Sequence, residues 1–237
     1  MGRTIAGGYD KSGEAAPDPL NKIGKMDRPT SVAELLAALT YGERKAADRA
    51  RSNLEFAPSG RARAQQSDVA EREDRNWRLM EARLAELGSI RDSERFAPFF
   101  DQFFEHTEPQ DWLEAQTFHY VGDAWVSDLA EVLVDVVDPV SAEILRHTLG
   151  ERHDQEIFAL DELHRALEED GSAKERIAAY SRRIVGEALT QTREALGHTT
   201  VLRDLMGGEE GEKALVLRLL ERHRARLDRL GVEPVEP

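Results

Sequence analysis

Residues 31–50 read SVAELLAALTYGERKAADRA, and their apolar members recur every three or four positions. This spacing predicts an amphipathic helix with one face toward a core. Ser31, followed by Glu34, forms a capping box that marks the start of the helix. Pro58-Ser59-Gly60 marks the end of the segment. One member of the apolar stripe is missing, because position 43 is a glutamate, so the buried face carries a carboxylate near its midpoint.

Polar residues interrupt the apolar stripe in the same way on three further predicted helices, at about 62–87, 109–137 and 139–168. An unpaired carboxylate is costly to bury, so such acids must share protons, pair with cations or bind metal. The residues that fall on the predicted inward faces are Glu73 and Asn76 on the second helix, His119 and Asp123 on the third, and His147, Glu151 and Asp154 on the fourth.

The spacing of these residues indicates one helix-pair unit used twice. Glu43 precedes Glu73-x-x-Asn76 by 30 residues, and Asp123 precedes Glu151-x-x-Asp154 by 28. Carboxylate-bridged dimetal bundles are built on this plan, with acids contributed by four helices. No strand pattern occurs. We therefore expect an all-α, ferritin-like four-helix bundle, with two additional C-terminal helices at 173–196 and 212–230.

Composition limits the class of protein. Forty per cent of the 237 residues are hydrophobic, and Ala, Leu, Glu and Arg dominate, which favours helix over sheet. We expect a disordered tail at 1–29 and one helical domain at 30–237. The absence of cysteine excludes thiolate chemistry. No apolar run is long enough to span a membrane and no secretion signal is evident, so we expect a cytoplasmic protein.

The net charge of −14 argues against tRNA or other nucleic-acid binding, although Arg182-Arg183 is one of a few local basic patches. Five phenylalanines lie close together near Pro98. They either pack over one end of the bundle or line an apolar substrate pocket. They are Phe96, Phe99, Phe100, Phe103 and Phe104.

Four segments make the chain resemble the ferritin-like proteins of the tRNA isopentenyladenosine hydroxylase (MiaE)-like family, in particular its actinobacterial branch. They are Tyr41-Gly42-Glu43-Arg44-Lys45-Ala46-Ala47, Asp111-Trp112-Leu113-Glu114, Tyr120-Val121-Gly122-Asp123 and Arg182-Arg183-Ile184-Val185-Gly186-Glu187-Ala188-Leu189. The similarity covers about residues 31–233. The resemblance implies a ferritin-like fold and a di-iron centre, which activates dioxygen as co-substrate to hydroxylate an unactivated carbon.

Carried over by position, the resemblance implies that Glu43, Glu73, Asp123 and Glu151 ligate two iron ions, or manganese. Both family histidines are replaced, by Asn76 and Asp154. Iron sites favour an imidazole nitrogen donor, whereas oxygen-only sites suit Mg, Ca or Mn.

Two other histidines could supply or support the missing ligands. His119 lies one turn before Asp123, and His147 lies one turn before Glu151, so each shares a helix face with its acid. A histidine on such a face is either a metal ligand or a hydrogen-bonded core residue. The sequence leaves both interpretations open.

Two functions follow from these alternatives. One is a dimetal oxygen-activating hydroxylase acting on an unknown substrate. The other is a metal-free helical interaction or assembly protein, with acids that share protons or are neutralised by arginines. Metal storage is a weaker third, because nothing indicates a shell-forming interface. The sequence is compatible with a homodimer and names no partner. The candidate cations are Arg44, Arg72, Arg152 and Arg183.

Overall fold

The computed structural model describes residues 29–135, 137–198 and 208–233, and all regular structure in these ranges is helical. The all-α prediction is confirmed. Most of the expected N-terminal tail lies outside the described residues. The four helices of the bundle are α1 (Pro29–Ser52), α2 (Gly60–Glu86), the continuous helix made of α4 (Trp112–Thr117), η4 (Phe118–Gly122) and α5 (Asp123–Leu133), and α6 (Pro139–Glu169).

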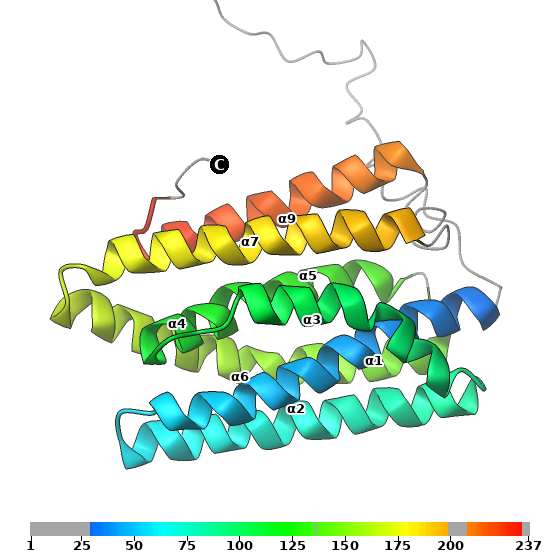
Figure 1. Ribbon diagram of the computed structural model, residues 1–237, viewed down its shortest axis with the longest axis horizontal. Coiled ribbons are helices and arrows are strands. Elements are labelled where there is room, and N and C mark those ends of the chain that lie inside the picture. Colours follow the sequence, from blue (N-terminus) through cyan, green and yellow to red (C-terminus); the bar gives the residue numbers. More distant parts are fainter. Residues whose placement is uncertain (1–28, 136, 199–207, 234–237) are drawn as a thin grey trace, which may run out of the picture.

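Further helices cover the bundle (Figure 1). α1 packs along α2 at one edge, while α7 and α9 lie at the opposite edge. α6 contacts both α2 and the 112–133 helix, and α3 contacts α7 and α1. The covering elements are η3 (Ile90–Phe96), α3 (Ala97–His106), α7 (Ala173–His198) and α9 (Glu209–Arg229), and η2 (Asn53–Phe56) extends α1.

Side-chain caps explain where the bundle helices begin. Ser59 Oγ accepts a hydrogen bond from the Ala62 amide at the start of α2. Asp138 does the same for Val140 and Ser141 at the start of α6, where Pro139 is the first helical residue. The third helix begins at Trp112 rather than at Pro109, because Asp111 Oδ1 accepts from the Glu114 amide at 3.0 Å.

A π-turn interrupts the third helix at residues 118–122. Such single wide turns insert one extra residue into an α-helix and are frequent at functional sites. All five of its residues are buried, and they include His119. Asp123 follows directly and begins α5. The π-turn therefore carries a polar side chain into the centre of the bundle.

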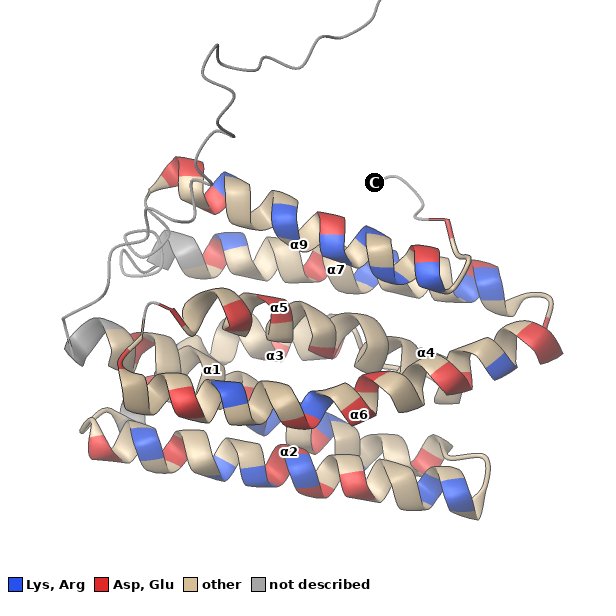
Figure 2. Ribbon diagram, turned by 180° about the vertical axis from the view of Figure 1, so that it is seen from behind, with Lys and Arg blue, Asp and Glu red and all other residues tan. Residues whose placement is uncertain are grey.

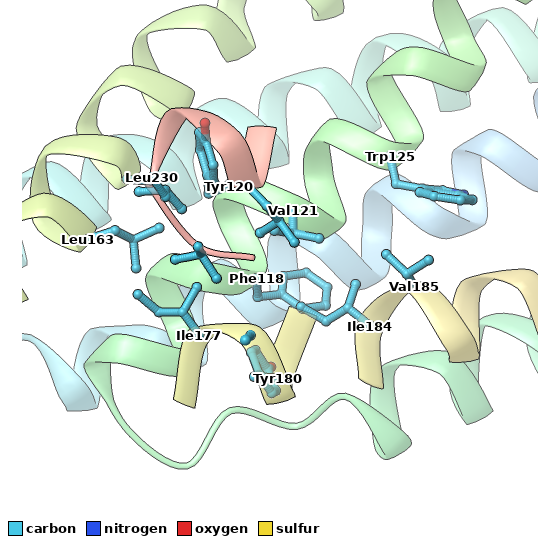
Figure 3. Close-up of a cluster of buried hydrophobic side chains, with 14 of the residues drawn as sticks. Phe118, Tyr120, Val121, Trp125, Leu163, Ile177, Tyr180, Ile184, Val185 and Leu230 are labelled. Carbon is cyan, nitrogen blue, oxygen red and sulfur yellow. The ribbon is translucent and has the colours of Figure 1, made fainter. Parts of the chain in front are cut away.

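The largest apolar cluster lies where α6, α7 and the π-turn meet (Figure 3). Phe118, Ile177 and Ile184 are almost completely buried in it. The Tyr120 hydroxyl donates to the Arg226 carbonyl at 3.2 Å, which joins this cluster to α9. The two C-terminal helices therefore complete the hydrophobic core and are more than surface additions.

Charged residues of both signs are interspersed along α2, α6 and α9 (Figure 2). Arg226 on α9 makes two hydrogen bonds to the buried Asp128 carboxylate on α5, at 2.6 and 2.9 Å. Within the part of the chain that the structure describes, no helix is both long and apolar enough to cross a membrane.

Candidate functional site

The centre of the bundle holds two carboxylates and a guanidinium from three different helices. Arg152 Nη2 on α6 donates to Glu43 Oε1 on α1 at 2.5 Å and to Glu73 Oε2 on α2 at 3.3 Å. Glu43 is 2% exposed and Glu73 is 1% exposed. Arg152 is also buried, so the three side chains form a polar cluster shielded from water. The guanidinium joins the two acids directly.

Burial dominates the electrostatics of this cluster. It raises the pKa of Glu43 to about 8, an effect that the neighbouring Glu73 reinforces through its charge and a hydrogen bond, while Arg152 opposes it. The two acids in turn raise the pKa of Arg152, against the opposing effect of its burial. Burial thus favours the neutral form of Glu43, while the neighbouring carboxyls favour the charged form of Arg152.

A second polar group lies beside this cluster on the 112–133 helix. His119 Nδ1 is 2.7 Å from Asp123 Oδ2, and Gln155 Nε2 donates to the same oxygen at 2.7 Å. Gln66 Nε2 is 3.0 Å from His119 Nε2. We assign the ring proton to Nδ1, which leaves Nε2 to accept from Gln66. Both ring nitrogens are then engaged with protein groups, which favours a hydrogen-bonded core role for this histidine.

On α6 the inward face differs from the one that the sequence predicts. Arg152 and Gln155 are buried, whereas Asp154 and His147 are exposed. The Glu151 side chain is 28% exposed, and its Oε1 lies 3.8 Å from His147 Nε2. The placement of Asp154 and His147 on the buried face is therefore wrong, whereas Glu151 is half-buried and its Oε2 is buried without a hydrogen-bond partner in the described structure.

The error on α6 is one of register. The sequence predicts Ile144, Leu145, Phe158, Leu160 and Leu163 as the apolar residues of this helix, and it places the inward acids between positions 144 and 158. Leu145 and Leu163 are completely buried, as is Ala159, whereas Ile144, Phe158 and Leu160 are only partly buried. Steps of four and seven back from position 159 reach 155 and 152, so the inward motif on this helix is Arg152-x-x-Gln155.

Residues 27–209 match a protein family described as the ferritin-like domain of actinomycetes. The chain belongs to this ferritin-like family. The match agrees with the predicted ferritin-like bundle and covers all four of its main helices. A comparison with curated proteins finds no match.

In this ferritin-like chain the first helix pair retains the predicted inward residues. Glu43, Glu73 and Asn76 are all buried, at the positions that the spacing indicated. Neither polar atom of the Asn76 side chain has a hydrogen-bond partner within the described structure. Asn76, which replaces a family histidine, therefore makes no side-chain hydrogen bond within the described structure.

Of the four arginines considered as cations, Arg152 is the one that enters the cluster. Arg44 pairs with Glu94 at the surface, and Arg183 contacts Glu114 on the 112–133 helix. Arg72 donates to the main-chain carbonyl of Glu151. These three arginines therefore bind groups at the periphery of the bundle and, within the described structure, make no hydrogen bond to Glu43 or Glu73.

Besides Gln155, two amides close to the cluster were not predicted. Gln66 donates to the Ala50 carbonyl at 2.8 Å as well as contacting His119, and Asn53 lies 3.4 Å from the same ring nitrogen. Gln66 could have been found, because it stands seven residues before Glu73 on the same helix face. Asn53 could not, because it lies on the 3-10 turn η2, beyond the periodic part of α1.

The donor set does not fit a pair of metal ions. A dimetal ferritin-like centre needs inward acids from four helices, and α6 supplies a cation at that place. Asp123 Oδ2 already accepts from Gln155 and contacts His119. In residues 29–135, 137–198 and 208–233 no group of three or more His, Asp or Glu side chains is arranged to hold a metal ion.

Proposed function

We propose that this chain is a metal-free ferritin-like protein that acts by binding and not by redox catalysis. The observation that carries the proposal is the position of Arg152 between Glu43 and Glu73. Buried carboxylates can be compensated by protonation, a cation or a metal ion, and here a side chain of the protein supplies a cation. The bundle therefore needs no metal to neutralise its acids.

A metal ion at the same place would face unfavourable electrostatics. Arg152 is permanently charged, because its pKa is raised further by the two acids. Two like charges a few ångströms apart in a buried site repel strongly. The oxygens without hydrogen-bond partners in the described structure include Glu43 Oε2, Glu73 Oε1, Asn76 Oδ1 and Glu151 Oε2. Asp123 Oδ2 on the second pair is already engaged by His119 and Gln155.

The second candidate is a MiaE-like dimetal hydroxylase, which the resemblance implies. It is favoured by the inward acids Glu43, Glu73 and Asp123. It is opposed by Asn76 and Asp154, which replace both family histidines, and by Arg152 and Gln155, which occupy the buried face of α6 where the fourth acid was expected. We rank it below the metal-free binding protein for this reason.

Metal analysis after anaerobic loading with Fe(II) or Mn(II) tests the proposal. We expect wild-type protein, purified without chelator, to retain far less than one ion per chain. The Glu73→Ala variant should give the same value. Stoichiometric metal in the wild type that Glu73→Ala removes would support the hydroxylase and refute our proposal.

A designed variant provides the positive control. Asn76→His, Arg152→Glu and Gln155→His, made together, create a Glu-x-x-His motif on both α2 and α6. We expect this triple variant to take up metal under the loading conditions that leave the wild type empty. If it fails to fold, the comparison of wild type with Glu73→Ala still decides the question.

A further inference from the structure

An apolar pocket lies between α1, α3, α5 and α7, with a cavity volume of about 140 Å³. Four of the five clustered phenylalanines line it, together with Trp125, whereas Phe104 packs in the core. Of the two roles left open for the phenylalanine segment, this geometry favours the lining of a pocket. Aliphatic side chains complete the wall, among them Leu35, Leu39, Val126 and Leu129.

Two glycines line the pocket where α1 and the π-turn border it. A Cβ on Gly42 would lie 2.7 Å from Phe100 Cε1, so the bare backbone of α1 allows this ring to pack directly against the helix. Gly122 is the last residue of the π-turn. The two glycines directly precede the inward acids Glu43 and Asp123. The pocket therefore lies at the level of the polar cluster but is built from other residues.

The wall offers no charge to a ligand. No charged side chain lines the pocket in the part of the chain that the structure describes, and a charged ligand would lose its hydration without gaining a partner. The polar lining residues are Gln191 and Thr192 on α7. Gln191 Nε2 donates to Gln102 at 3.0 Å and to Glu187 at 2.8 Å, and its Oε1 has almost no accessible surface. Binding in this pocket therefore rests on apolar contact.

Size and wall chemistry favour one aromatic ring as the ligand. An apolar cavity of about 150 Å³ stays free of water and is large enough for benzene. Aromatic pairs gain more free energy than the burial of their area alone provides. The rings in the wall come from three elements of the fold, with Phe96 on η3, Phe99, Phe100 and Phe103 on α3, and Trp125 on α5.

We infer that this pocket binds an uncharged benzene ring, bare or alkyl-substituted, through apolar contact and without a hydrogen bond. The inference rests on the proposed function, because it names the ligand class of a binding protein. The two can fail separately: metal uptake tests Arg152 and its acids, whereas hydrocarbon binding tests a pocket that contains none of them.

Ligand-observed NMR titration of the full-length protein tests the inference, with toluene, p-cresol and benzoate as probes. We expect toluene to bind saturably and at least about 5-fold more tightly than p-cresol, because a hydroxyl that loses its hydration without gaining a partner lowers affinity. Benzoate should not displace toluene. Absence of toluene binding, p-cresol that binds as tightly as toluene or more tightly, or displacement by benzoate would each overturn the inference.

Two matched variants locate the site. Ala38→Phe fills the pocket from α1 and should abolish toluene binding. Ala82→Phe adds the same ring at an exposed position of α2, outside the pocket, and should bind toluene as the wild type does. Toluene binding that survives in folded Ala38→Phe, or that both variants lose, contradicts the assignment. If Ala38→Phe does not fold, as judged by circular dichroism, Thr192→Phe fills the pocket from α7 instead, and the three probes on the wild type decide in either case.

Discussion

The two helix pairs of the bundle place different chemistry at equivalent inward positions. α1 and α2 contribute Glu43, Glu73 and Asn76, while the 112–133 helix and α6 contribute Asp123, Arg152 and Gln155. The separation along the sequence within each pair is nearly equal, because Glu43 precedes Glu73 by 30 residues and Asp123 precedes Arg152 by 29. The first pair therefore presents two acids and an amide to the centre, whereas the second presents one acid, a cation and an amide.

This difference teaches how a ferritin-like bundle can retain buried acids without a bound cation. Arg152 reaches from the second pair to Glu43 and Glu73 of the first. Gln155, one turn further along α6, donates to Asp123 within its own pair. Glu43, Glu73 and Asp123 therefore each have a hydrogen-bond partner on α6. Arg152 joins the two helix pairs through its buried ion pairs with Glu43 and Glu73.

The largest effect should come from breaking that contact. Arg152→Met leaves two acids buried without a cation, and loss of one partner from a buried ion pair costs about 3–5 kcal/mol of folding free energy. Urea denaturation measures this change. Arg146→Met, at a residue on α6 whose side chain is 55% exposed, should stay within about 0.5 kcal/mol of the wild type.

A triple variant separates loss of charge from loss of packing. Adding Glu43→Gln and Glu73→Gln to Arg152→Met removes the uncompensated charges, so most of the lost stability should return. If Arg152→Met alone costs less than about 1 kcal/mol, well below the range for a buried pair, Arg152 is not the compensating cation.

The next effect concerns pH. The folded pKa of Glu43, about 8, lies above its ordinary value of 4.5, so the folded protein binds one more proton than the unfolded chain between these values. The contribution is fully present below pH 4.5 and is lost as pH rises toward 8. Stability should fall across this window by up to about 1.4 kcal/mol per pH unit.

Thermal or urea unfolding at several pH values measures this slope. Glu43→Gln should flatten it, because the amide stays neutral throughout. Glu143→Gln, at an acid on α6 whose side chain is 81% exposed, should follow the wild type. A wild-type profile that coincides with that of Glu43→Gln between pH 5 and 8 would contradict the raised pKa.

The comparison of the two pairs also shows what the sequence could predict. The helices, the break at Pro58-Ser59-Gly60 and the inward residues of the first pair follow from apolar periodicity and turn chemistry. On α1 and α2 the stripes contain enough large apolar residues to define the register. The fold and half of the candidate site were therefore predictable.

The other half was not predictable for a physical reason. The inward face of α6 near its midpoint consists of polar side chains, including Thr148, Arg152 and Gln155. A hydrophobic pattern carries no information across such a stretch, and a shift of one residue turns a helix by about 100°. The carboxylates at 151 and 154 then resemble the expected motif, although the neighbouring positions face the core.

The smallest effect tests the equivalence of Asn76 and Gln155, which hold the same place in the two pairs. Gln155→Met removes a hydrogen bond to the buried Asp123 carboxylate and should cost about 1–3 kcal/mol. Asn76→Leu removes an amide that has no partner in the described structure, and should cost less than about 1 kcal/mol or stabilise the protein.

Urea denaturation of both variants gives the two values under the same conditions. A larger cost for Gln155→Met than for Asn76→Leu means that the Gln155 amide of the second helix pair stabilises the protein by binding Asp123. The Asn76 amide of the first pair would then be buried without stabilising the fold. Equal costs would show that Asn76 makes a bond of similar strength, and the two pairs would then be alike at this position. A larger cost for Asn76→Leu would reverse the comparison, because the first pair would depend on its amide more than the second.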